Sequence, residues 1–192
     1  MDRWTVPNPF ISELHSVLRA YGVELTDFSF NKEPANVGET FLAVNVRKLN
    51  VVIRVGVDHI TYMVGNPDWG VAPQLVELFD TVSQAVWSFL GQEPVTQQLT
   101  LAFHVTPGAT PLRHSSSKLV NCEALGDADF YGISVHRESD SLVIDKSLRY
   151  DNAAFIRIQR THKGPVGFSI VARQLYADEL KALDLLNISG VV

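Results

Sequence analysis

The sequence predicts an α+β fold, in which mostly antiparallel β-sheet packs against a long central helix and further helices lie near both ends of the chain. Segments rich in Val, Ile, Phe and Tyr, as strands are, far outnumber segments with helical spacing. The polar breaks between these segments are too short for the crossovers that parallel strands need. Residues 72–90 carry an amphipathic pattern that is long enough to lie across a sheet.

The chain length of 192 residues suits a single α+β domain over residues 1–192. We expect two halves, 1–94 and 95–192, to share one core. Residues 40–90 and residues 129–187 each consist of several predicted strands followed by a helix, which gives a weak signal of internal duplication. The halves show no residue-level identity, so this remains a hypothesis.

The first half opens with a predicted helix over residues 9–21. Asn8 can cap this helix, Pro9 suits its first position because no N–H is needed there, and Gly22 can end it. After Gly22 the sequence alternates between strand-forming runs and short polar breaks. The strands that we predict here are 23–30, 41–46, 51–57 and 60–64.

Residues 72–90 form the best-defined predicted element. Apolar side chains recur at a spacing of three and four, Pro73 marks the start of the helix, and Gly91 and Pro94 mark its end. Trp87 widens the apolar face. We interpret this segment as the central helix, covered on more than one side.

The second half begins with a segment, residues 95–105, that alternates as a half-buried strand. Leu101 and Phe103 share one face, while Thr100 and His104 share the other. The remaining elements that we predict are a loop over 106–117, strands over 130–137, 142–145, 153–162 and 168–173, and a helix over 177–186.

Composition narrows the classes of function. Only 19% of the residues are charged, against about 25% in average globular domains, so the chain is charge-poor. A formal net charge of −5 argues against a nucleic-acid partner, and the absence of a long apolar run argues against a membrane. Because Cys122 is the lone cysteine and no secretory signal is evident, we expect no disulfide and a cytoplasmic location.

No motif for catalysis stands out. Phosphate-binding loops, dinucleotide fingerprints, nucleophile elbows and metal-binding helix motifs are missing from the sequence. We therefore predict no catalytic residue, cofactor or metal site, which leaves the question of an enzyme open but favours a non-enzymatic role. His104, His136 and His162 lie on separate predicted strands and could converge on one sheet face, although scattered surface imidazoles are the favoured interpretation.

Two polar groups of residues could bind an anion. Arg113, His114, Ser115 and Lys118 bring together two cations, an imidazole and a hydroxyl in one loop, although a solvated loop explains them equally well. Arg157 lies on a predicted strand, and we expect Arg149 and Arg173 on neighbouring strands to extend an arginine-lined sheet surface. Scattered charges on a solvated face are the alternative.

Two functions of different classes follow. The first is a soluble, non-enzymatic binding or assembly protein that acts through self-association, most simply as a homodimer, or through a protein partner. The alternative is a small-molecule-binding protein or enzyme with a pocket between the sheet and the central helix. The polar residues that we expect in such a pocket are Tyr62, His104, Tyr131 and Arg157.

Overall fold

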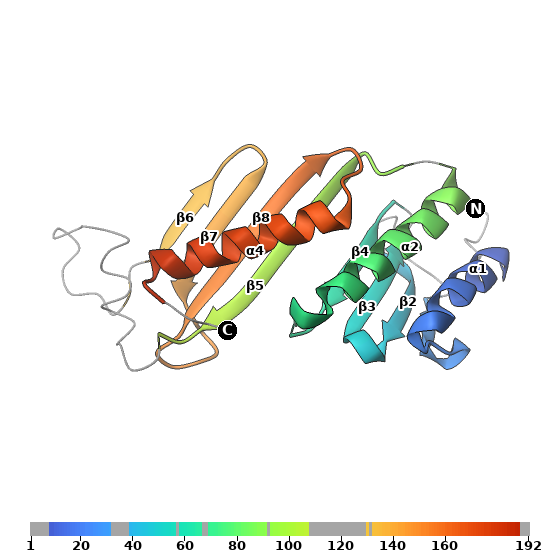
Figure 1. Ribbon diagram of the computed structural model, residues 1–192, viewed down its shortest axis with the longest axis horizontal. Coiled ribbons are helices and arrows are strands. Elements are labelled where there is room, and N and C mark those ends of the chain that lie inside the picture. Colours follow the sequence, from blue (N-terminus) through green and yellow to red (C-terminus); the bar gives the residue numbers. More distant parts are fainter. Residues whose placement is uncertain are drawn as a thin grey trace. The chain divides into compact units, whose positions relative to one another are not determined.

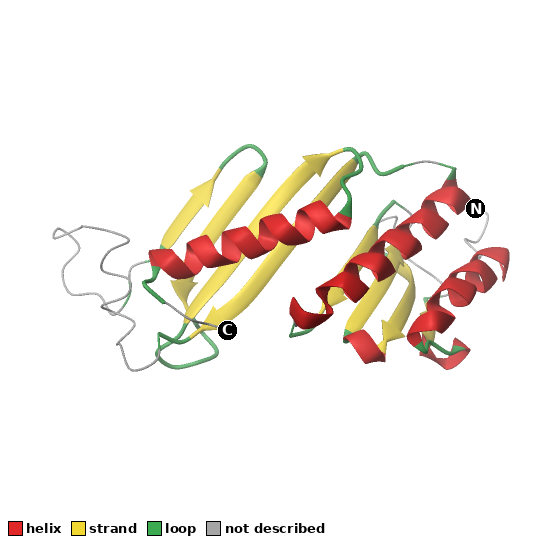
Figure 2. Cartoon of the chain, in the orientation of Figure 1, coloured by secondary structure: helices red, strands yellow, loops and turns green. Residues whose placement is uncertain are grey.

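The chain folds as two compact units, Met1–Glu93 and Pro94–Val192. Our computed structural model describes residues 8–31, 39–56, 58–66, 69–91, 93–107, 130 and 132–188. Each unit contains a four-stranded antiparallel sheet and helical cover (Figures 1 and 2), which confirms the predicted α+β class with antiparallel sheets. The sharing of one core, the central helix and the internal duplication stay predictions.

Unit 1 is a strand meander with two helices on one face. Its strands lie in the sheet in the order of the sequence, β1-β2-β3-β4. The first helix continues through a 3₁₀ turn to Gly22, whose φ of 75° is a left-handed conformation that glycine adopts without strain. The elements are α1 (Asn8–Leu18), β1 (Phe28–Phe30), β2 (Thr40–Val46), β3 (Val51–Gly56), β4 (Ile60–Val64) and α2 (Ala72–Leu90).

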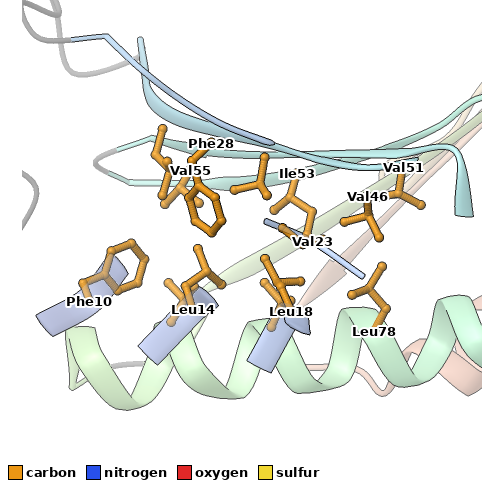
Figure 3. Close-up of a cluster of buried hydrophobic side chains, with 14 of the residues drawn as sticks. Phe10, Leu14, Leu18, Val23, Phe28, Val46, Val51, Ile53, Val55 and Leu78 are labelled. Atoms are coloured by element: carbon orange, nitrogen blue, oxygen red, sulfur yellow. The ribbon is translucent and has the colours of Figure 1, made fainter. Parts of the chain in front are cut away.

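Strand alternation builds the core of unit 1. Leu42, Val44 and Val46 on β2 are each 0% exposed, because alternate side chains point to the same face of the sheet. Leu14 and Leu78 meet them from α1 and α2 (Figure 3). Each such buried side chain contributes about 1.5–3 kcal/mol to folding. The side chains of this cluster fill the space between the sheet and the helices.

Unit 2 places one long helix along one face of its sheet (Figure 1). Its elements are β5 (Thr96–Val105), β6 (Ile133–His136), β7 (Asp140–Lys146), β8 (Ala154–Lys163) and α4 (Phe168–Leu185), with the strands in the order β5-β8-β7-β6. Ile144, Ile156 and Ile158 pack against Ala182 and Leu183 of α4. In unit 2, β6, β7 and β8 form a meander, and β5 pairs with β8, the last strand of that meander. In unit 1, β2, β3 and β4 form a meander, and β1 pairs with β2, its first strand.

The structure corrects the predicted strand over residues 168–173. These residues form the first turns of α4, which runs on to Leu185. Their composition resembles that of a strand, but Val171 shares a helix face with Ala182, and both are buried. Packing against the sheet therefore overrides the low helix propensity of β-branched residues.

The predicted strand over residues 23–30 is also largely wrong. Only Phe28–Phe30 pairs with β2, because Leu25–Asp27 forms a 3₁₀ turn. The Asp27 carboxylate accepts the backbone N–H of Glu24 at 2.9 Å and pairs with Arg47 at 2.9 Å. This local hydrogen bond gives the backbone an alternative to the sheet.

None of the helices in the described part of the chain is long and apolar enough to cross a membrane.

Candidate binding surface

The sheet of unit 2 has one face against α4 and a second face, here called the open face. Because neighbouring residues alternate, Leu101 and Phe103 pack toward α4 while Thr100 and His104 point away. The register places His104 opposite Phe155 and Thr100 opposite Gln159. The predicted alternation of this strand is therefore confirmed.

An aromatic cluster occupies one end of the open face. The His104 ring lies 5.1 Å from the Tyr150 ring and 5.2 Å from the Phe155 ring, between centroids. Arg149 places its guanidinium carbon 5.2 Å from the centre of the Tyr150 ring, which is a cation–π contact. Leu148, in the same turn, is fully exposed at 103%. These five residues are called the aromatic surface below.

Ser147 holds the turn that carries this surface. Its side chain is buried, and its Oγ accepts the backbone N–H groups of Arg149 at 3.1 Å and Tyr150 at 2.9 Å. The same oxygen lies 3.0 Å from Nδ1 of His104. Since both lone pairs of the hydroxyl are engaged by these N–H groups, we expect its hydrogen to donate to Nδ1 of His104. This arrangement predicts the tautomer of His104 that carries its proton on Nε2.

The structure places two of the expected polar residues on the open face. Arg157 lies opposite Ala102, one step diagonal from His104, and both side chains are exposed. The arginine-lined surface is smaller than predicted, because Arg173 lies on α4 and donates its Nε–H to the Ser169 carbonyl at 3.3 Å. Arg149 lies in the turn before β8 rather than on a strand.

Tyr62 has a structural position within unit 1. Its hydroxyl lies 2.6 Å from Oγ of Ser83 and donates to the Phe79 carbonyl at 3.4 Å, so that it ties β4 to α2. Its ring lies 4.5 Å from that of Phe79, between centroids, with the two planes tilted by 35°. Burial raises the pKa of Tyr62 far above its ordinary value, and the charge of Asp80 adds to this effect. The hydrogen bond from Ser83 opposes the shift only in part.

Several candidate residues fall outside the described part of the chain. These are Arg113, His114, Ser115, Lys118 and Tyr131, so their roles stay predictions. The three histidines considered as metal ligands do not converge, since His104 and His136 lie on opposite edge strands and His162 faces α4. Among the described residues, no three side chains of metal-ligating type lie close enough to hold an ion.

On the face of the sheet in unit 2 that packs against α4, polar contacts join the sheet to the helix and to the segment before it. Arg160 donates from Nη2 to Oδ1 of Asp178 at 2.8 Å and from Nε to Oδ2, a paired arrangement. These hydrogen bonds raise the pKa of Arg160, and burial opposes the shift. Further along, Gln97 accepts the Val166 N–H at 2.7 Å. Among the described residues, His162 Nε2 and Gln174 Oε1 are buried and have no hydrogen-bond partner.

The sequence contained a signal for the turn that presents the aromatic surface. Leu148 and Tyr150 are large apolar or aromatic residues in a turn, where Gly, Asn, Asp and Ser are usual. An apolar side chain in a turn indicates either a buried contact or an exposed contact surface.

Comparison of the chain with models of known protein families, with curated proteins and with solved structures found no match.

Proposed function

We propose that this chain is a non-enzymatic binding or assembly protein that acts by contact with another protein chain through the aromatic surface. The exposure of Leu148 and Tyr150, at 103% and 48%, on a turn fixed by Ser147 carries the proposal. Tyr and Arg are enriched at protein interfaces, where a few large side chains supply most of the binding energy. Because Ser147 fixes the turn, less conformational entropy is lost on binding.

A protein fits this surface better than a small molecule does. Small ligands bind in concave sites that enclose most of their area, whereas Leu148 and Tyr150 of the aromatic surface are exposed on a turn. In unit 1 the region between sheet and helices, where the alternative function needs a pocket, holds buried hydrophobic side chains (Figure 3). As part of the same proposal, we expect the protein to work in the cytoplasm, because its lone Cys122 suits a reducing compartment.

Site-specific photo-cross-linking tests the proposal. A photoreactive phenylalanine analogue replaces Tyr150 in the full chain, and the matched control carries it at Ser169, an exposed position on α4. We expect light-dependent adducts with a protein chain, a second copy or another protein, from position 150 and not from position 169. Leu148→Ser should reduce the yield of these adducts. Equal yields from both positions, or none from position 150, would contradict the proposal.

A further inference from the structure

β5 is an edge strand of the sheet in unit 2. Among the described strands it pairs with β8 alone, so one row of its backbone groups has no partner in the described part of unit 2. The N–H of Gly164 donates to the Val95 carbonyl at 2.8 Å, so the backbone groups of Val95 point toward β8. Because direction alternates along a strand, the N–H and C=O groups of every second residue from Thr96 to His104 point away from the sheet. Within unit 2 as described, no hydrogen bond occupies these groups.

This edge lacks the features that usually keep a strand from pairing with another chain. It is 10 residues long, whereas β1, β4 and β6 contain 3, 5 and 4 residues. Its register with β8 runs without a bulge, and its sequence holds no proline and no Lys, Arg, Asp or Glu. Proteins usually protect a long edge with such features or cover it. Val95, just before the strand, is 85% exposed.

We propose that β5 pairs with β5 of a second copy of this chain, antiparallel, across a two-fold axis at Thr100. This inference goes beyond the proposed function, since it places the contact with a second copy at the strand edge and not at the aromatic surface. With the axis at Thr100, Thr96 lies opposite His104 of the second copy and Gln98 lies opposite Ala102. Every outward-pointing N–H and C=O of the strand then meets its complement.

The choice of axis and of a second copy rests on self-complementarity. Moving the axis to Leu101 places Thr96 opposite Thr106, which lies beyond the end of the strand, and leaves the pairing incomplete. With the axis at Thr100, Leu99 lies opposite Leu101 on the α4 side of the sheet, and the exposed Val95 lies opposite Val105. No charged side chains come together in this register, because the strand carries none.

The pairing makes one continuous eight-stranded sheet from two units of four strands each. A two-fold axis perpendicular to a sheet keeps equivalent faces together, so both copies of the aromatic surface lie on the same face. A bivalent partner could then contact both copies with increased avidity. Since about 10 residues contribute from each side, fewer than in a standard interface, we expect a dissociation constant of about 10 μM for the dimer.

Analytical ultracentrifugation of the full chain tests the dimer. We expect a reversible dimer whose dissociation constant rises at least about tenfold in Thr100→Lys, because the two ammonium groups would lie directly opposite each other. Gln159→Lys is the matched control, since Gln159 lies beside Thr100 on β8, away from the edge. It should leave the dimer unchanged. A wild-type chain that stays monomeric, or a dimer that tolerates Thr100→Lys, would overturn the inference.

Disulfide trapping tests the register and remains informative if the Lys variant folds poorly. In a Cys122→Ser background, Thr100→Cys should form an intermolecular disulfide, because residues at the axis have Cα atoms about 5.5 Å apart. Gln98→Cys alone should not, because its partner is Ala102. Failure of Thr100→Cys to cross-link overturns the proposed register. Adducts from position 150 without a β5 dimer would uphold the aromatic surface alone, and a dimer without such adducts would uphold β5 pairing alone.

Discussion

The Ser147 hydroxyl lies 3.0 Å from Nδ1 of His104 and connects the β7–β8 turn to the edge strand β5. The two residues are 43 positions apart in the sequence. The same oxygen accepts two backbone N–H groups of the turn, so one buried side chain fixes both the loop and the imidazole. The aromatic surface is thus ordered before any partner binds.

Ser147 is predicted to be important for stability. In Ser147→Ala the N–H groups of Arg149 and Tyr150 lose their acceptor, which we expect to cost about 1–3 kcal/mol in the free energy of unfolding, measured with urea. Ser134→Ala, which removes an exposed hydroxyl 2.7 Å from His136, should cost less than about 0.5 kcal/mol. In the wild type, ¹⁵N NMR should show the His104 proton on Nε2. Equal costs for the two serines would show that Ser147 does not organise the turn. A proton on Nδ1 would show that the imidazole, and not the hydroxyl, is the donor in their contact.

The raised pKa of the Tyr62 hydroxyl should make the free energy of unfolding fall at alkaline pH. Its folded pKa lies above the ordinary value of 10.0, so above about pH 10 the unfolded chain loses a proton that the folded chain keeps. The stabilisation is complete below pH 10 and is lost as the pH rises toward the folded pKa, with a slope of about 1.4 kcal/mol per pH unit. Urea unfolding between about pH 9 and 11 should show this slope as a difference between wild type and Tyr62→Phe.

Ser83→Ala separates burial from hydrogen bonding as the cause of that slope. It removes the hydroxyl that lies 2.6 Å from Tyr62 but leaves the ring beneath α2. Because burial is the main cause of the raised pKa, the slope should persist in this variant. If the slope vanishes in Ser83→Ala, or is already absent from the wild type, the tyrosine is not held neutral by burial.

The ion pair between Arg160 and Asp178 should couple α4 to β8. Arg160→Met and Asp178→Asn should each cost about 1–3 kcal/mol, because the remaining partner stays partly buried without its complement. The double variant should cost less than the sum by about 1–2 kcal/mol, as measured by a double-mutant cycle. Arg157→Met, on the open face, should change stability by less than about 0.5 kcal/mol. Strict additivity of the two single variants would refute the coupling.

Substitution of two glutamines of unit 2 should change the free energy of unfolding in opposite directions. Gln174→Met removes a buried oxygen that has no hydrogen-bond partner and should raise stability by about 1 kcal/mol. Gln97→Met removes the acceptor of the Val166 N–H and should lower stability by about 1 kcal/mol. Thermal unfolding of the two variants provides the comparison. A shift of the same sign in both would contradict the assignment of these contacts.

The sequence predicted those elements whose ends carry distinct chemical signals. Pro73 and Gly91 bound α2, which spans Ala72–Leu90 as expected, and the alternation of 95–105 correctly assigned both faces of β5. It failed where a tertiary contact decides the local structure, as at Val171, which packs as part of a helix despite its strand-like neighbours. The sequence placed His104 on the polar face of its strand and Arg157 on a sheet surface, but it also offered both as residues of a pocket beneath a helix, and they lie on the face away from α4. It could not show the contact between His104 and Ser147, which depends on strand register.

Hydrogen exchange of the β5 amides, followed by NMR on the full chain, tests most directly the claim that β5 of this protein pairs with β5 of a second copy. The N–H groups of Thr96, Gln98, Thr100, Ala102 and His104 point outward from the sheet. Our account predicts that they are protected well above the dissociation constant of about 10 μM and exchange quickly well below it. Rapid exchange at every concentration would show that no second chain pairs there. Protection at every concentration would show that the edge is covered without a reversible dimer of this affinity. Either result would contradict the proposed β5 pairing.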